Sequence, residues 1–230
     1  MVGTTESGPP GTSQWWAAHA ERLERRRPRV DGLTIERIVD EALALVDGEG
    51  LDALTVRALA ARFDTSSATL YRHVASRGEL LVLLVDQVLG EIRLPDPALG
   101  GRTKVVLLSR DLRRVLLAHP NVVAALRAAP LMGPNAVRCA DAGLANLLEH
   151  GYPADLAIPA YLALIDYVLG SVFFQSARGN PEPGGPAPGS APTLEANWTE
   201  VGDADSDGVF VFGLETFLTG LDCLADRAGR

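Results

Sequence analysis

The residues with the clearest chemical potential lie in one stretch, Leu54-Thr-Val-Arg-Ala-Leu-Ala-Ala-Arg-Phe-Asp-Thr-Ser-Ser-Ala-Thr-Leu-Tyr-Arg-His-Val74. Two short segments with helical spacing flank a break in this stretch, and Ala60 supplies the small residue that a close helix crossing needs. The second segment begins with small polar side chains, where free backbone amides and the helix dipole favour a nearby phosphate. Arg57 is of the residue type that most often reads guanine. The stretch therefore predicts a helix-turn-helix whose second helix enters a major groove of DNA.

The same stretch resembles the tetracycline-repressor (TetR) family of bacterial transcriptional regulators. The motifs that carry the resemblance are Glu49-Gly50, the Leu-Thr-x-Arg-x-Leu-Ala of 54–60, and Thr69-Leu-Tyr-Arg-His-Val74 with Arg77 and Glu79-Leu-Leu81. Weaker similarity to the C-terminal domain of the tetracycline-repressor subgroup extends through His119-Pro120, Gly133-Pro-Asn135, Glu149-His-Gly-Tyr152 and Asp166-Tyr-Val-Leu-Gly170. The resemblance implies a ligand-released repressor that binds a palindromic operator as a homodimer. An activator of the same fold stays open as an alternative.

The resemblance also assigns roles to individual side chains of the helix-turn-helix. Base contacts are expected from Arg57, Ser67, Ala68 and Thr69, next to Ser66 at the start of the second helix. Phosphate contacts are expected from Thr55, Tyr71, His73 and Arg77.

Two features beside these contacts need a separate interpretation. The family's turn usually has Gly where this chain has Asp64, and Asp is among the few other residues that tolerate positive φ. The basic run at residues 25–29 either reaches an adjacent minor groove or forms a solvated tail.

Helical periodicity continues along the chain and predicts an all-α fold. Thr34 can cap one helix, and Ser76 with Glu79 forms a capping box for another. We expect a flexible tail with a short basic, Trp-containing helix at 1–30, a DNA-binding domain at 31–78, a connecting helix at 79–94 and a ligand-binding and dimerisation domain at 95–230. Residues 179–208 contain six glycines and five prolines, which predicts a flexible loop.

The late helices at 154–177 and 209–227 are the most apolar and are the expected dimer interface. Gly170, Gly213 and Gly220 offer close approach there, although the same glycines can also pack within one chain. Asp166 shares a helix face with apolar residues, so we expect a buried carboxylate with a partner. That partner is a ligand amine, a group of the second subunit, or an arginine such as Arg110, Arg113 or Arg114.

An effector pocket is expected among the middle helices. Its candidate residues are His119, Tyr161, Asp166, Tyr167, Phe173 and Gln175, although aromatic residues at helical spacing are more often core. Founding members of the subgroup hold magnesium-bound tetracycline with a His and a Glu, and Asp166 and Gln175 stand near those positions here. The sequence therefore favours a different, largely apolar effector, with no metal and no cofactor.

Composition and short motifs further limit the classes of protein that fit this chain. The 29 acidic and 21 basic residues give a net charge of −8, but residues 179–208 hold six acids and no Lys or Arg, so the acidity does not exclude DNA binding. Cys139 and Cys223, with no secretory pattern, indicate a reduced cytoplasmic protein without a membrane span. Residues 203–208 imitate the start of a calcium loop, but Leu214 stands where its closing Glu belongs. No nucleophile or phosphate-loop motif supports an enzyme, which stays a distant alternative.

Overall fold

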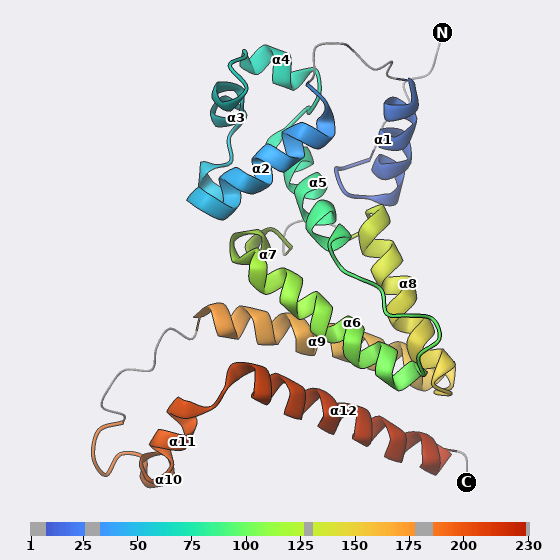
Figure 1. Ribbon diagram of the computed structural model, residues 1–230, viewed down its shortest axis with the longest axis vertical. Coiled ribbons are helices and arrows are strands. Elements are labelled where there is room, and N and C mark those ends of the chain that lie inside the picture. The colour runs from blue at the N-terminus through green and yellow to red at the C-terminus, as the bar shows by residue number, and fades with distance from the viewer. Residues whose placement is uncertain (1–7, 26–32, 127–130, 178–185, 229–230) are drawn as a thin grey trace. The chain divides into compact units, whose positions relative to one another are not determined.

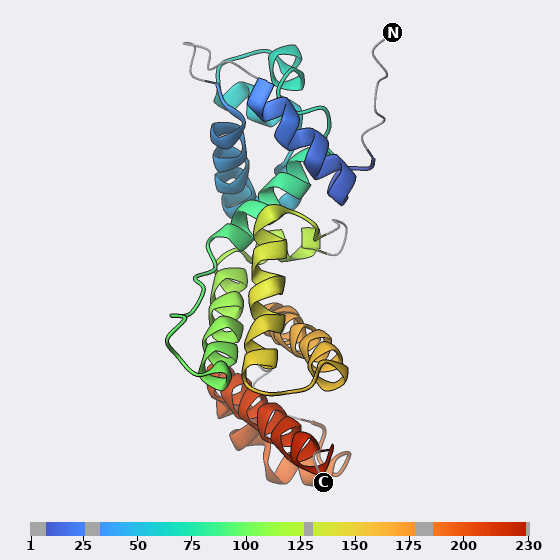
Figure 2. The same cartoon turned by 90° about the vertical axis from the view of Figure 1, so that its right-hand side faces the viewer.

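The computed structural model describes residues 8–25, 33–126, 131–177 and 186–228. Every regular element in these ranges is a helix, and they contain no strand, which confirms the all-α prediction (Figure 1 and Figure 2). The chain divides into two compact units, Met1–Leu94 with Arg114–Gly143, and Pro95–Arg113 with Leu144–Arg230. The chain passes from one unit to the other between Leu94 and Pro95, and again inside helices α6 (Gly101–Ala118) and α8 (Pro134–Glu149).

The first unit contains the predicted helix-turn-helix. Its helices are α1 (Ser13–Arg25), α2 (Ile35–Glu49), α3 (Val56–Arg62), α4 (Ser67–Tyr71), α5 (Arg77–Gly90) and α7 (Pro120–Leu126), with a 3-10 turn at Leu51–Ala53. Helices α2, α5 and α7 pack together, and α3 packs on α4. The core of this unit includes Ile38, Val46, Leu59 and Leu84, all fully or nearly fully buried.

Side-chain caps set where these helices begin. Hydroxyl groups of Thr34, Thr55, Ser66 and Ser76 each accept a hydrogen bond from the amide three residues further on. Such caps satisfy amides that have no partner within the helix, so the sequence itself specifies the start of each element.

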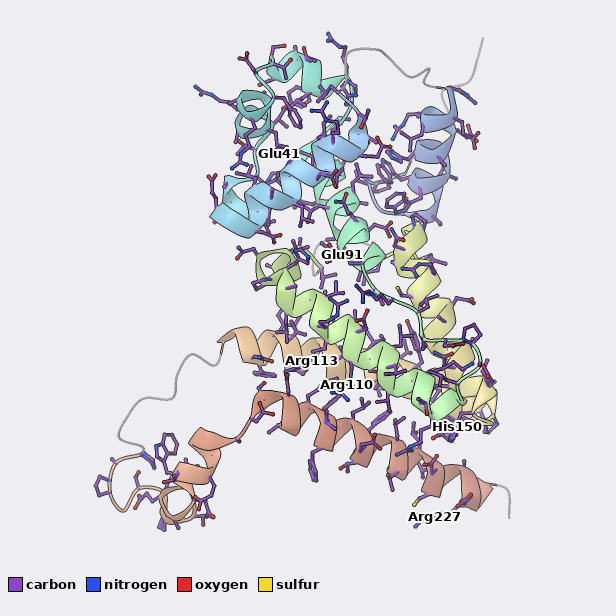
Figure 3. All side chains as sticks on the ribbon, in the orientation of Figure 1. Glu41, Glu91, Arg110, Arg113, His150 and Arg227 are labelled. Carbon is purple, nitrogen blue, oxygen red and sulfur yellow. The ribbon has the colours of Figure 1, made fainter. Side chains whose placement is uncertain are left out.

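Polar contacts tie α7 to the ends of α2 and α5. His119 lies just before α7, with its Nδ1 2.8 Å from Asp47 Oδ2 and its Nε2 3.2 Å from Glu91 Oε1. Asn121 Nδ2 donates to Val46 O at 2.9 Å. Figure 3 labels Glu91 at the end of α5.

The second unit is built on the long helices α9 (Ala154–Ala177) and α12 (Ser206–Ala228), which pack against each other. Parts of α6 (Gly101–Ala118) and α8 (Pro134–Glu149) complete it. The buried cluster includes Val105, Leu147, Leu164, Val168, Leu214 and Leu218. A close approach of backbones occurs at Gly101, where an added Cβ would lie 2.6 Å from His150 N.

Asp222 on α12 joins several elements of this unit. Tyr152 donates its hydroxyl to Asp222 Oδ1 at 2.6 Å, Arg102 donates to Asp222 Oδ2 at 2.7 Å, and His150 Nε2 lies 3.2 Å from Asp222 Oδ1. Burial alone would raise the pKa of Asp222, but Tyr152, His150 and Arg102 outweigh it and hold that pKa below its ordinary value. The same contact, together with burial, raises the pKa of Tyr152.

The prediction of a flexible loop at 179–208 is wrong for the part that the structure describes. Helices α10 (Pro192–Ala196) and α11 (Trp198–Asp203) form there despite the high Gly and Pro content. Asp205 caps α12 by accepting the Gly208 amide at 2.7 Å. The predicted tail at 1–7, the basic run at 26–29 and the loop start at 179–185 lie outside the described residues.

Candidate DNA-binding site

Helix α3 presents the first two candidate contacts. The Thr55 hydroxyl accepts the Ala58 amide at 3.0 Å, so the side chain is fixed at the start of the helix while its O–H can still donate outward. Thr55 and Arg57 are both exposed, and Leu59 and Ala60 on the opposite side are buried. One face of α3 therefore holds the helix in place and the other is available to a partner.

The turn between α3 and α4 has the conformation expected of it. Asp64 has φ 47°, and among the described residues it is the one non-glycine with positive φ. The Thr65 amide donates to Ala60 O at 2.9 Å and closes the turn. The carboxylate of Asp64 remains exposed.

Helix α4 displays the small polar residues that the sequence predicts for a recognition helix. Ser66 accepts the Thr69 amide at 3.2 Å, and its Oγ lies 3.0 Å from Thr69 Oγ1. Arg72 also donates to Thr69 Oγ1, at 3.2 Å. The exposed candidates are Ser66, Ala68 and Tyr71, and the half-buried ones are Ser67, Thr69 and His73. Leu70 and Val74 are buried and anchor the helix.

Arg77 has a structural role that the sequence did not reveal. Its Nε donates to Leu54 O at 2.9 Å and its Nη2 donates to Leu51 O at 2.8 Å. The guanidinium thus ties the start of α5 to the turn that precedes α3. A contact between two helix starts depends on the tertiary fold, so no local pattern signals it.

Ion pairs hold α3 against α2. Arg62 donates to Glu41 at 2.6 Å and to Glu49 at 2.7 Å, and Figure 3 labels Glu41 on α2. Because all three side chains are partly exposed, these pairs add little stability but restrict the orientation of α3.

Glu79, like Asp86, is a buried carboxylate of this unit. Its own amide donates to Ser76 Oγ at 3.1 Å, which confirms one half of the predicted capping box. Its Oε2 accepts the amide of Ala75, one residue before Ser76, at 2.7 Å. Burial would raise the pKa of Glu79, but His19, the Ala75 amide and the charge of Arg22 together hold that pKa below its ordinary value.

The candidate effector residues are divided between the two units. His119 belongs to the first unit, and the other five belong to the second. Tyr167 donates its hydroxyl to Phe210 O at 2.7 Å and stacks on that ring, and Gln175 accepts from buried Arg113, labelled in Figure 3. Tyr161 and Phe173 are half-buried.

The expectation that Asp166 is buried is wrong. Asp166 is exposed, and so is Leu162 one turn earlier. Helical spacing correctly placed both on one face of α9, but that face points away from the core of its own unit. An exposed carboxylate needs no buried partner, so the reason for assigning it one disappears.

The arrangement of α3 and α4, with caps, a tight turn and an exposed polar face, defines a helix-turn-helix DNA-binding protein. Residues 38–84 match the family described as "Bacterial regulatory proteins, tetR family", and residues 94–224 match "Tetracyclin repressor-like, C-terminal domain". The chain therefore belongs to the tetracycline-repressor family and is a transcriptional regulator.

Individual relatives agree with this assignment. An HTH-type transcriptional regulator of Saccharopolyspora erythraea is 35% identical over 174 residues, which is 75% of this chain and 71% of the relative. The class E tetracycline repressor protein of Escherichia coli is 25% identical over 198 residues, covering 85% and 93% of the two chains. Apo ActR from Streptomyces coelicolor superposes with a TM-score of 0.75 at 33% identity, covering 87% of this chain and all of that one. ActR has also been solved in complex with actinorhodin, with a TM-score of 0.73 to this chain at 34% identity over 84% of this chain and 98% of that one.

Proposed function

We propose that this regulator is a repressor that binds a two-fold symmetric operator as a homodimer and is released when a small molecule binds. The observation that carries the proposal is the exposed face of mostly polar residues formed by Thr55 and Arg57 at the start of α3 and by Ser66, Ala68 and Tyr71 along α4. Since caps and buried anchors hold this face in place, it meets DNA without reorganisation.

Each contact has an expected role. Arg57 reads a base edge, and Ser67, Ala68 and Thr69 face bases in the major groove. Thr55, Tyr71 and His73 hold the phosphate backbone. Arg77 keeps its two carbonyl partners and offers only its remaining N–H groups to phosphate.

A second copy of the chain fits the exposed apolar surface of the second unit. Helix α9 exposes Ile158, Leu162 and Phe174, and α12 exposes Val209, Phe212 and Leu224. An added Cβ at Gly170 or Gly220 meets nothing within 4 Å, whereas one at Gly213 would clash with Tyr167 of the same chain. Gly213 thus serves internal packing, and Gly170 and Gly220 remain open to a partner. Both helices are long and apolar enough to span a membrane, but a dimer interface explains that composition as well.

We further infer that the effector is largely apolar and binds within the region 95–230. Residues 31–78 form the DNA-binding domain, and the helix at 79–94 connects that domain to the effector-binding region. ActR, a similar protein, is described in complex with actinorhodin, which supports an organic effector. Tyr161 and Phe173 are the aromatic candidates whose side chains remain partly accessible. The names of the relatives also support a regulator without enzymatic activity, acting in the cytoplasm where bacterial DNA lies.

The test is binding of the full chain to DNA flanking its own gene and to selected palindromes, measured by fluorescence anisotropy. Arg57→Ala should reduce discrimination between operator and random DNA, with a loss of about 1–3 kcal/mol for the operator only. Arg227→Ala removes the same charge from exposed α12 and is the matched control. Equal weakening on operator and random DNA in Arg57→Ala would overturn the assigned role, and absence of any salt-sensitive complex would overturn the function.

A further inference from the structure

Helix α1 precedes the helix-turn-helix and is docked on it. Trp15 and His19 are 3% and 5% exposed, as buried as the core of the unit. Their rings stack with centroids 4.8 Å apart, and the Arg22 guanidinium lies 5.8 Å from the centre of the Trp15 ring. One side of α1 therefore forms a defined interface that contains a cation.

This interface reaches the buried carboxylate of Glu79. Arg22 Nη2 lies 3.3 Å from Glu79 Oε1 and 3.2 Å from His19 Nδ1. His19 Nδ1 lies 3.7 Å from the same carboxylate oxygen, which is beyond hydrogen-bond distance. Arg22 can donate to both neighbours, so its guanidinium is the charged group at hydrogen-bond distance from Glu79 Oε1. His19 orients that guanidinium and also lies close to the same carboxylate.

The other oxygen of Glu79 holds the chain where it leaves α4. Oε2 accepts the Ala75 amide at 2.7 Å, and Ala75 directly follows the buried anchor Val74. The carboxylate therefore joins α1 on one side to the turn between α4 and α5 on the other. Glu79 is only 4% exposed, whereas the Arg22 side chain that reaches it is about half exposed.

We infer that α1 positions the recognition helix for DNA binding, with Arg22, His19 and Glu79 as positioning residues that do not themselves contact DNA. This inference rests on the proposed function. Loss of the Arg22 guanidinium removes a hydrogen bond from a buried carboxylate that keeps only the Ala75 amide and, 3.7 Å away, His19, so Glu79 must take up a proton or move toward solvent. Either change weakens its hold on the Ala75 amide. Because α4 is short, release of the chain that follows it changes the orientation of several base-contacting side chains together.

The experiment uses Glu79→Gln and Arg22→Met in the full chain, with the palindrome selected by the unaltered protein. The operator Kd is measured at a temperature where circular dichroism shows every variant fully folded. Each variant should raise the Kd by about tenfold, the size of effect that one charge-assisted hydrogen bond produces. Because Glu79→Gln removes a negative charge near DNA, simple electrostatics would tighten binding instead. Glu21→Gln makes the same charge change on exposed α1 and is the control, expected to leave the Kd unchanged or slightly lower.

A double variant separates positioning from general damage. If Arg22 acts through Glu79, the double variant Arg22→Met/Glu79→Gln should bind no more weakly than the weaker single variant. Folded variants with a lower Tm but an unchanged Kd would show that α1 only stabilises the unit, and that result overturns the inference. If Glu79→Gln does not fold, Arg22→Met, which leaves the capping box in place, decides the question. An unaltered protein that binds no selected DNA would overturn the proposed function, and this inference with it.

Discussion

Among the described glycines, Gly101 is the one where an added Cβ would come closest to backbone atoms. In Gly101→Ala the new Cβ would lie 2.6 Å from His150 N, 2.7 Å from Asn146 O and 2.8 Å from His150 Cα. All three atoms belong to the backbone at the end of α8, so none can rotate away and one helix must shift. Buried Lys104 pairs with Glu149 at 2.6 Å across the same contact, and a shift would lengthen that pair. Overpacking of this kind costs about 1–3 kcal/mol of unfolding free energy.

Thermal unfolding followed by circular dichroism measures this effect. For a chain of this size about 1 kcal/mol lowers Tm by about 2–4 °C, so Gly101→Ala should lower Tm by about 2–12 °C. Gly100→Ala is the matched control, since a Cβ there meets nothing within 4 Å. If the two variants unfold at the same temperature, the close approach of α6 and α8 is not as the structure shows it.

Three further outcomes are expected. Phe212, 73% exposed on α12, is assigned to the dimer interface, so Phe212→Asp should sediment as a monomer and bind the operator more weakly; a persistent dimer would refute that assignment. Asp64→Ala should lower Tm by several degrees relative to Asp64→Gly, because a left-handed conformation costs an ordinary residue about 1–2 kcal/mol, and equal Tm values would contradict the turn geometry. The folded pKa of Asp222 lies below its ordinary 3.8, so its contacts stabilise the fold fully above that pH and lose their effect as pH falls further. Asp222→Asn should therefore lower Tm at pH 7 and reduce the decrease of Tm at acid pH. If Tm depended on acid pH as it does in the unaltered protein, the hydrogen-bond network around Asp222 would be contradicted.

The helix-turn-helix could be predicted from the sequence because local chemistry specifies it. Thr55 marks the start of α3, Asp64 tolerates the positive φ of the turn, and Ser76 with Glu79 forms a capping box. Each signal acts within three or four residues, so a pattern along the chain is enough to find it.

Contacts between distant residues could not be predicted in this way. Arg77 donates to carbonyls at positions 51 and 54, and Arg22 reaches Glu79 across 57 positions of sequence. Nothing in the spacing of these residues shows that they meet. The burial of Trp15 and His19 on a common side of α1 could have been predicted, because residues four apart share one face of a helix.

Asp166 shows a different limit. Periodicity groups residues on a common face but does not say whether that face meets the chain's own core, solvent or a second copy. On α9 both sides are apolar, with Leu164 and Val168 buried and Leu162 and Phe174 exposed. A helix that packs inside its unit and also forms an oligomer interface lacks the polar side that would orient it.

Selection of binding sites from random-sequence DNA by the full chain tests the central claim most directly. The face formed by α3 and α4, repeated by a second copy, should enrich a two-fold symmetric site whose half-sites lie about one helical turn, or a multiple of it, apart. Arg57→Ala should enrich a site with relaxed preference at one position in each half. Enrichment of no sequence, or of an asymmetric site that Arg57→Ala leaves unchanged, would contradict the assignment of α3 and α4 as the surface that reads DNA.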